Sequence, residues 1–500
     1  MENKINRITD ILRRDDGISG AMMYTEQISW ILFLKFLSDL EDSKADEALL
    51  NGQSYTYIID DKFKWSNWAC PKIKDDSGRD GKLDVINAKS GEDLLEFVNN
   101  ELFAYLKGFK SLTENAKSIK YKIGAIFEFL DNRIANGHTL REVLDIIDGM
   151  DFHNQADLFQ LSLIYEKLLK DMGSDGGNSG EFYTPRPLIK VIADVVNPQV
   201  GQTVYDPAVG SCGFLIEAYN HIRYTDIEKN EQRELSTEQL KFLNEDTFFG
   251  NEKTPLSYVM GVMNMILHGI ESPNIAKANT LTKDIRGLEE KDRFDCILAN
   301  PPFGGKENDS IQQNFPIKSN ATELLFLQHM MNYLKLGGKC GVVIPEGVLF
   351  QTNNAFKAVK QELLERFNVH TILSLPAGIF LPYSGVKTNV LFFDRNGSTS
   401  DIFYYEVNPP YKLTKNKPIQ YEHFKEFLNV WGDRTLTDNS WIVNINDIKE
   451  FDISAKNLNN VEVIKHKTPI ELVENIKTNT KEIDILMNEI ETILIGKDIL

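Results

Sequence analysis

The sequence predicts an α/β fold in which a Rossmann-like domain lies between an N-terminal helical domain and a C-terminal helical tail. From residue 203 to 407, short apolar runs typical of buried strands alternate with segments of helical period. Residues 1–165 are mostly of helical period, and residues 473–494 follow a heptad pattern. These changes predict domains at 1–165 and 172–430, a connecting segment at 431–467 and a separate helix at 468–500.

Composition predicts a globular, cytoplasmic protein. Five hundred residues are too many for one ordinary core, and the hydrophobic content of 42% is that of a globular chain. No window is apolar enough to span a bilayer, so no membrane association is expected. The four cysteines are far apart and form no CxxC pair, which favours reduced thiols without structural zinc: Cys70, Cys212, Cys296 and Cys340.

Five helices are expected in the N-terminal domain. One should begin at a Thr25 cap and be buried on most of its circumference, since apolar residues crowd 28–40. The other helical patterns lie at 92–107, 116–132, 140–148 and 157–171. Residues 55–84 are irregular and rich in Trp (Trp65 and Trp68), Lys and Asp, and are predicted to be a loop.

The central domain should begin after a glycine-rich linker at 172–185. Thr184 and Pro185 are expected to open a helix, with Pro185 in its first turn. Helices are also predicted from Phe214, after a Thr254 cap, and at 323–334 and 355–365. The predicted strands lie at 203–205, 246–250 (ending at Asn251 and Glu252), 275–281, 294–299, 339–344, 369–375, 390–394 and 402–407. This alternation implies a mostly parallel sheet covered on both faces.

Two acidic strand ends indicate a nucleotide-like ligand. The loop 206–213 follows a strand and opens a helix, and Gly210 and Gly213 would let a ligand approach the backbone. Asp206 could accept a hydrogen bond from an ammonium group, although a plain strand–helix turn explains the loop equally well. Glu252 ends the next strand, where a carboxylate can accept both ribose hydroxyls. The alternative for Glu252 is a charge that favours a helix N-terminus.

The strongest signal is Asn300-Pro301-Pro302-Phe303, directly after an apolar strand. Two prolines fix the backbone as it leaves the sheet. The Asn300 amide oxygen and the Pro301 carbonyl could accept both hydrogens of an exocyclic amine, and Phe303 could stack on its ring. Such an amine is out of reach inside a duplex, so the base would have to be flipped out. A proline turn without chemistry is the alternative reading.

Several other enzyme classes lack their signatures. No GxxxxGK[ST] occurs, which argues against a helicase or kinase, and no GxSxG elbow is present. The eight histidines form no HExxH pair, so no metal site is expected.

In combination, these motifs resemble the modification (M) subunit of type I restriction–modification systems, an N6-adenine DNA methyltransferase. The resemblance identifies Asp206, Gly210, Ser211 and Gly213 with the S-adenosylmethionine loop, although Cys212 stands where glycine is common. The remaining matches are Glu181, Phe182, Tyr183 and Thr184 before the cofactor site, Glu252 as the ribose acid, Asn279 in the adenine-contacting segment (where Asp is common), residues 385–390 near the target base, and Asn300, Pro301, Pro302 and Phe303 as the catalytic motif.

The resemblance implies S-adenosylmethionine as cofactor, DNA as substrate and direct methyl transfer without a covalent intermediate. It also implies a specificity (S) subunit that reads the sequence, two M subunits per S subunit and an optional nuclease-translocase (R) subunit. The net charge of -18 agrees with delegated recognition, because phosphate contacts require Lys and Arg. The C-terminal heptads could contact that partner or pack on their own chain, and both readings stay open.

Three rival readings stay open. A stand-alone adenine methyltransferase would need its own recognition domain and a less acidic surface. A binding scaffold with a dead site is disfavoured because Asp206, Glu252 and Asn300 are all present. A protein-glutamine methyltransferase also uses an Asn-Pro-Pro turn, but usually with Tyr and in a much shorter chain.

Overall fold

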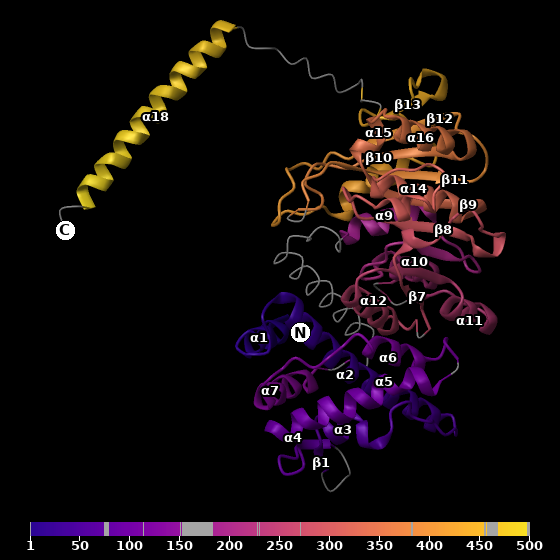
Figure 1. The fold of residues 1–500 in the computed structure, drawn as a ribbon, viewed down its shortest axis with the longest axis vertical. Helices are drawn as coiled ribbons and strands as arrows, with labels where there is room; N and C mark the ends of the chain where they lie inside the picture. The colour runs from indigo at the N-terminus through magenta and orange to yellow at the C-terminus, as the bar shows by residue number, and fades with distance from the viewer. Residues whose placement is uncertain are drawn as a thin grey trace. The chain divides into compact units, whose positions relative to one another are not determined.

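The computed structural model describes residues 2–74, 80–113, 115–150, 152, 184–227, 229, 231–270, 272–381, 384–454, 457 and 469–497. The chain divides into two compact units, Met1–Ala455 and Lys456–Leu500 (Figure 1). The predicted helix at 157–171 and nearly all of the predicted linker at 172–185 lie outside the described residues.

The N-terminal part of the first unit is helical, as predicted. Its long central helix is α2, and a π-helical turn at Phe97–Leu102 joins α4 to α5. The helices are α1 (Glu2–Leu12), α2 (Ala21–Leu50), α3 (Trp65–Trp68), α4 (Gly91–Glu96), α5 (Phe103–Leu112), α6 (Ile119–Phe127) and α7 (Gly137–Asp148). Of the four helices predicted after the first one, three therefore have counterparts here, at α4–α5, α6 and α7.

The predicted cap of α2 is wrong, although the helix and its burial are confirmed. The helix begins after Gly20, and Thr25 is fully buried inside it. Residues 21–24 contain no residue that interrupts a helix, so the first turn extends back to the glycine. The aliphatic and aromatic side chains between Ile28 and Leu37 are buried, as their crowding around the helix requires.

The prediction of a loop at 55–84 is also wrong. The segment contains α3 and a small hairpin of β1 (Lys72–Lys74) and β2 (Asp80–Leu83), and Trp65 and Trp68 are buried. The Trp65 indole donates to the Asp148 carboxylate at 2.9 Å, and this long-range bond, which the local sequence does not reveal, anchors the segment on α7.

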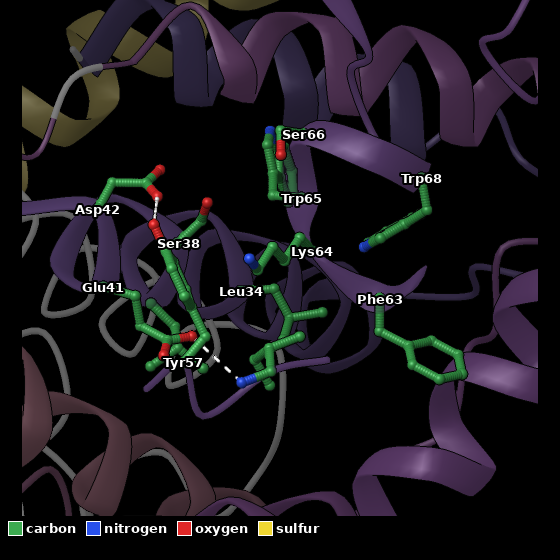
Figure 2. Close-up of a pocket in the computed structure, with 12 residues that line it drawn as sticks. Leu34, Ser38, Glu41, Asp42, Tyr57, Phe63, Lys64, Trp65, Ser66 and Trp68 are labelled. Atoms are coloured by element: carbon green, nitrogen blue, oxygen red, sulfur yellow. Dashed lines mark hydrogen bonds between the residues drawn. The ribbon is translucent and has the colours of Figure 1, made fainter. Parts of the chain in front are cut away.

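A pocket forms where this segment closes on α2 (Figure 2). The Glu41 carboxylate accepts hydrogen bonds from the backbone N–H groups of Ile58 and Ile59, and the Tyr57 hydroxyl donates to Asp42 at 3.2 Å. The Lys64 ammonium lies 3.5 Å from the centroid of the Tyr57 ring. These contacts join the segment to the helix, so the polar groups of the pocket stabilise the domain.

Within the described residues, nine strands form one sheet in the order β13-β12-β10-β11-β9-β8-β3-β6-β7. All neighbours are parallel except those of β11 and β13, which run against the others. The strands are β3 (Val204–Asp206), β6 (Phe248–Glu252), β7 (Asn274–Lys277), β8 (Phe294–Ala299), β9 (Leu334–Pro345), β10 (Asn368–Ser374), β11 (Thr388–Asp394), β12 (Asp401–Glu406) and β13 (Ser440–Asn444). A separate small hairpin pairs β4 (Tyr224–Asp226) with β5 (Glu231–Gln232).

Helices cover both faces of the sheet, which confirms the α/β prediction. The helices on one face are α9 (Arg186–Val196), α10 (Gly213–Arg223) and α12 (Pro255–Leu267), whereas α14 (Thr322–Tyr333) and α16 (Asn354–Arg366) cover the other. Shorter helices lie between strands: α11 (Thr237–Glu245), α13 (Asp309–Gln312), α15 (Glu346–Phe350) and α17 (Lys425–Val430). Pro185 is the N-cap of α9, not a first-turn residue as predicted, because the helix begins at Arg186.

One buried cluster joins the N-terminal helices to the first face of the sheet. Contact between the two parts runs through α12, where Tyr258 packs edge-on against Phe129 at 5.8 Å between ring centroids. All four cysteines are described, free and buried, in agreement with reduced thiols. No helix in the described part of the chain is long and apolar enough to cross a membrane.

The segment 431–467, expected to be a connection, contributes β13 to the sheet at its edge beside β12. The second unit contains α18 (Pro469–Lys497), a helix of 29 residues as the heptads predict. Five of the predicted heptad positions have at least half of their side-chain surface exposed: Val473, Ile476, Ile483, Met487 and Ile490.

Candidate active site

Three of the predicted site residues are brought together by strand pairing. β3 lies between β6 and β8 and is parallel to both, so the carboxyl ends of all three strands share one edge of the sheet. Asp206 ends β3, Glu252 ends β6, and Asn300 directly follows β8. This edge is where ligands bind in open α/β sheets.

Asn300 has one occupied and one unused hydrogen-bonding end. Its amide nitrogen donates to the Thr184 hydroxyl at 2.9 Å. Its amide oxygen is buried and has no partner among the described residues. A buried carbonyl oxygen without a donor costs free energy unless a ligand supplies one. The Thr184 contact therefore leaves the acceptor of Asn300 available to a donor that arrives with a ligand.

Phe303 continues the turn beyond the two prolines and is half-buried against the core. Its ring meets that of Phe380 edge-to-face, with 6.4 Å between the centroids. Phe380 itself is buried in the loop that follows β10, at the same edge of the sheet. An aromatic ring supported in this way can present a flat surface to a planar ligand. The sequence did not single out Phe380.

Asp206 lies at the centre of the edge and is only 1% exposed. One carboxylate oxygen accepts the backbone N–H of Ala208 at 2.9 Å, while the other has no partner among the described residues. Burial raises the pKa of this carboxyl to about 8, and the nearby Glu252 charge adds to the increase. A cation bound here would stabilise the ionised form.

Glu252 is tied to the glycine loop. Its two oxygens accept the backbone N–H groups of Gly210 at 3.0 Å and Thr254 at 2.7 Å. Burial raises the pKa of Glu252, and these hydrogen bonds oppose the increase. Because a carboxylate has about four lone-pair sites, both oxygens can still accept hydroxyl groups. The Thr254 bond also agrees with the alternative reading of Glu252 as an acid at a helix start.

The glycine loop has the left-handed backbone that its composition suggests. Gly210 has a φ of 49° and Cys212 a φ of 63°. Glycine, which has no Cβ, adopts this left-handed conformation without strain, and this explains why glycine is common at position 212. Cys212 precedes α10, which begins at Gly213, and its thiol is fully buried with a pKa raised by that burial. Ser211, between the two left-handed positions, is half-buried.

Two residues of α12 support this loop and were missed by the sequence analysis. Asn264 is buried and its amide nitrogen donates to the Ser211 carbonyl at 2.9 Å. A Cβ on Gly261 would lie 2.7 Å from the Gly210 carbonyl oxygen and 2.9 Å from the Cys212 sulfur. Only glycine permits that approach. The available signal was an amide and a glycine on an otherwise apolar helix.

The segment after β7 closes the other side of the loop. Thr280 donates its hydroxyl proton to the Pro207 carbonyl at 2.5 Å, and the backbone N–H of Ala278 bonds the Glu252 carbonyl at 2.8 Å. Asn279 lies between them and is half-buried, with its side-chain oxygen accepting the Leu281 N–H at 3.1 Å. Its amide nitrogen can still donate to a ligand. Thr280 is a further supporting residue that the sequence analysis missed.

Behind the edge, a chain of polar side chains lies on the face of the sheet that α14 covers. The Asn251 amide donates to the Tyr205 hydroxyl at 2.9 Å, and that hydroxyl lies 3.0 Å from Nε2 of His329. Burial lowers the pKa of His329 to about 3, so the imidazole is neutral. This chain orients Asn251, the neighbour of Glu252. Of the remaining predicted residues, Glu181, Phe182 and Tyr183 lie outside the described residues.

Comparisons with known proteins identify the same organisation. The N-6 DNA methylase family model matches residues 155–468, and the HsdM N-terminal domain model matches residues 1–147. The chain is 34% identical to the type I restriction enzyme EcoEI methylase subunit of Escherichia coli, over 98% of this chain and 96% of that one.

Solved structures agree. A protein described as a modification subunit of a type I restriction enzyme from Vibrio vulnificus YJ016 is 36% identical, covers 93% of this chain and 98% of its own, and superimposes with a TM-score of 0.82. A chain from work on complex assembly of the type I R-M system is 39% identical, with 99% and 98% covered and a TM-score of 0.73. The chain therefore belongs to the N-6 DNA methylase family, as a modification (M) subunit of the type I class.

Proposed function

We propose that the chain transfers a methyl group from S-adenosylmethionine to N6 of adenine in DNA, as the catalytic subunit of a type I restriction–modification complex. The observation that carries the proposal is the buried, unpartnered amide oxygen of Asn300 at the edge formed by β8, β3 and β6. Family membership supplies the reaction class, and this acceptor supplies the place where the amine would bind.

The residues present fit the cofactor. Asp206 offers a buried oxygen without a partner, suited to a cationic ligand, and Gly210 brings the loop backbone close to it. Glu252 can accept the ribose hydroxyls, and Asn279 can donate to the adenine ring. When bound, S-adenosylmethionine supplies an electrophilic methyl group. We assign Ser211, Gly213 and the segment of Glu181, Phe182, Tyr183 and Thr184 to the walls of this site.

The chain's own contribution to the reaction is to prepare the amine. Asn300 Oδ1 and the Pro301 carbonyl would each accept one hydrogen of the exocyclic amine, which concentrates its lone pair on nitrogen. Pro302 fixes the turn, and Phe303 stacks on the flipped base. Thr184 holds the Asn300 amide by its nitrogen, so that its oxygen faces the amine. We therefore give Thr184 a positioning role in addition to its place beside the cofactor.

The target sequence would be chosen by a separate specificity subunit. The net charge of -18 leaves the chain with little general affinity for DNA, so the partner would supply most of the phosphate contacts. We propose that two copies of this chain join one specificity subunit, and that a nuclease-translocase subunit can be added. The exposed heptad positions of α18 are the proposed contact with the specificity subunit.

Methyl transfer from labelled S-adenosylmethionine tests the proposal, with and without the co-expressed specificity subunit. The complex should methylate adenine in DNA, and Asn300→Ala should abolish transfer while cofactor binding, measured by calorimetry, is retained. Methylation by the chain alone would refute delegated recognition. An active Asn300→Ala variant would refute the catalytic role of Asn300.

A further inference from the structure

A cationic hairpin projects from the catalytic edge of an otherwise acidic chain. Residues 407–420 contain three lysines and no Asp or Glu. The hairpin comprises residues 411–418, and its tip is closed by reciprocal backbone hydrogen bonds of 3.1 Å between Thr414 and Lys417. The three side chains at issue are Lys412, Lys415 and Lys417. We call residues 411–418 the lysine hairpin.

The lysine hairpin is anchored to the fold by Leu413, although its lysines are exposed. Leu413 is buried, and the Tyr411 hydroxyl donates to the Pro418 carbonyl at 3.3 Å. In the described part of the chain, none of the three ammonium groups pairs with a carboxylate, and their one contact there is that of Lys417 with the Tyr411 ring, 5.9 Å from its centroid. Other exposed lysines, such as Lys62 and Lys229, do form ion pairs. The three ammonium groups are therefore free to meet an external anion.

Topology places this hairpin on the side of the molecule that carries Asn300. It follows β12, which is parallel to β10, and both strands end at the same edge as β8. A Cβ on Gly378, in the loop after β10, would lie 3.6 Å from the Leu413 carbonyl oxygen. That loop also carries Phe380, whose ring supports Phe303. Packed contacts thus lead from the hairpin to the catalytic motif.

We propose that Lys412, Lys415 and Lys417 bind phosphates of the DNA strand beside the flipped adenine. This inference rests on the proposed function, and it identifies where the chain itself grips DNA. β12 is four strands from β8, roughly 19 Å across the sheet, so the contacted phosphates would lie within about six base pairs of the target. Ammonium groups on this hydrogen-bonded turn would position the duplex without reading its sequence.

The test measures how affinity for a methylatable duplex depends on salt, for the complex with the specificity subunit. Lysine binding to three phosphates adds about three units to the slope of log K against log salt. The variant Lys412→Gln/Lys415→Gln/Lys417→Gln should therefore have a slope smaller in magnitude by about 2 to 3, for specific and unrelated sequences alike. At saturating DNA, its rate of methyl transfer should equal that of the unaltered complex.

A charge-matched control is Lys241→Gln/Lys291→Gln/Lys339→Gln, because these exposed lysines lie on α11, before β8 and in the first half of β9, away from the catalytic edge. The control should keep the full slope. An unchanged slope in the hairpin variant, or an equal loss of slope in the control, would overturn the binding proposal. Methylation by the unaltered complex would uphold the proposed function in either case. Absence of methylation in the unaltered complex would instead reject the function, and the slopes would still decide the binding surface.

Discussion

The Thr184 hydroxyl accepts a hydrogen bond from the Asn300 amide nitrogen at 2.9 Å, across 116 positions of sequence. Thr184 stands two residues before α9, and Asn300 directly follows β8. The bond fixes the orientation of the Asn300 amide, so that the buried oxygen is the end without a partner among the described residues. Its consequence is that the proposed acceptor, the Asn300 amide oxygen, depends on a residue that the sequence assigned only to the cofactor site.

The first prediction concerns this bond. Thr184→Val keeps the shape of the side chain and removes the hydroxyl, so the Asn300 amide loses the partner that orients it. We expect the turnover rate to fall about 10-fold to 100-fold, the equivalent of one or two hydrogen bonds, with little change in cofactor affinity. Steady-state methylation and calorimetric titration of S-adenosylmethionine would separate the two quantities.

Thr184→Ser is the control, because it retains the hydroxyl and should retain most of the rate. If valine weakened cofactor binding and left turnover intact, Thr184 would be a cofactor contact without a positioning role. A serine variant as slow as the valine variant would show that the methyl group, not the hydroxyl, is needed.

A second prediction follows from the raised pKa of Asp206, about 8 against an ordinary 3.8. At pH values between 3.8 and about 8, the Asp206 carboxyl keeps its proton in the folded chain and has lost it in the unfolded chain. This carboxyl therefore lowers the free energy of unfolding as pH rises from about 4 to 8. Asp206→Asn removes this effect. We expect the substitution to raise the free energy of unfolding of the cofactor-free protein by about 1–3 kcal/mol more at pH 8.5 than at pH 5.

Urea denaturation of both proteins at the two pH values measures the difference. The same substitution should weaken cofactor binding, because the asparagine cannot become an anion that attracts the cationic cofactor. A stability difference that is the same at pH 5 and pH 8.5 would contradict the assigned pKa. Cofactor affinity equal to that of the unaltered protein would remove Asp206 from the binding site.

A third prediction concerns Asn264, which holds the glycine loop by the Ser211 carbonyl. Asn264→Ala removes the buried amide that donates to this carbonyl, and should cost about 1–3 kcal/mol of stability together with a loss of cofactor affinity. Asn332→Ala is a matched control, because Asn332 also donates to a carbonyl from a helix, that of Gln328 at 2.9 Å. The control should lose stability only. Equal effects on cofactor affinity would refute a specific role for Asn264.

Much of the sheet could be predicted because its strands are short apolar runs with clear ends. The strand Phe294–Ala299 was predicted to the residue, since Asn300 and two prolines end it. β9 begins five residues before its predicted start, because Gly337 and Gly338 form an irregularity within the strand instead of a turn before it. β13 was missed because an edge strand with alternating exposure carries a weak apolar signal.

Predictions of the site were limited in a different way. Strand order brings Asp206, Glu252 and Asn300 to one edge, and motif spacing along the chain was sufficient to anticipate it. The residues that support them, Asn264 and Phe380, act through partners 53 and 77 positions away. Neither distance leaves a periodic or local signal. Tertiary packing alone defines such supporting roles.

The last prediction concerns α18 and the choice between its two readings. Ile483 belongs to the heptad seam and Ile485 lies on the opposite side of the helix, and each is 58% exposed. If the seam contacts the specificity subunit, Ile483→Glu should weaken assembly by about 10-fold to 100-fold, since burying one isoleucine contributes about 1.5–3 kcal/mol. Ile485→Glu, an identical change at equal exposure, should leave assembly unaltered. Both variants should bind S-adenosylmethionine normally, because the proposed cofactor residues lie in the other unit.

Sizing chromatography over a concentration series measures the assembly, with truncation of residues 468–500 as the extreme case. Undiminished complex formation by the truncated chain would mean that α18 packs on its own chain, and equal losses for the two isoleucines would reject the seam as the contact.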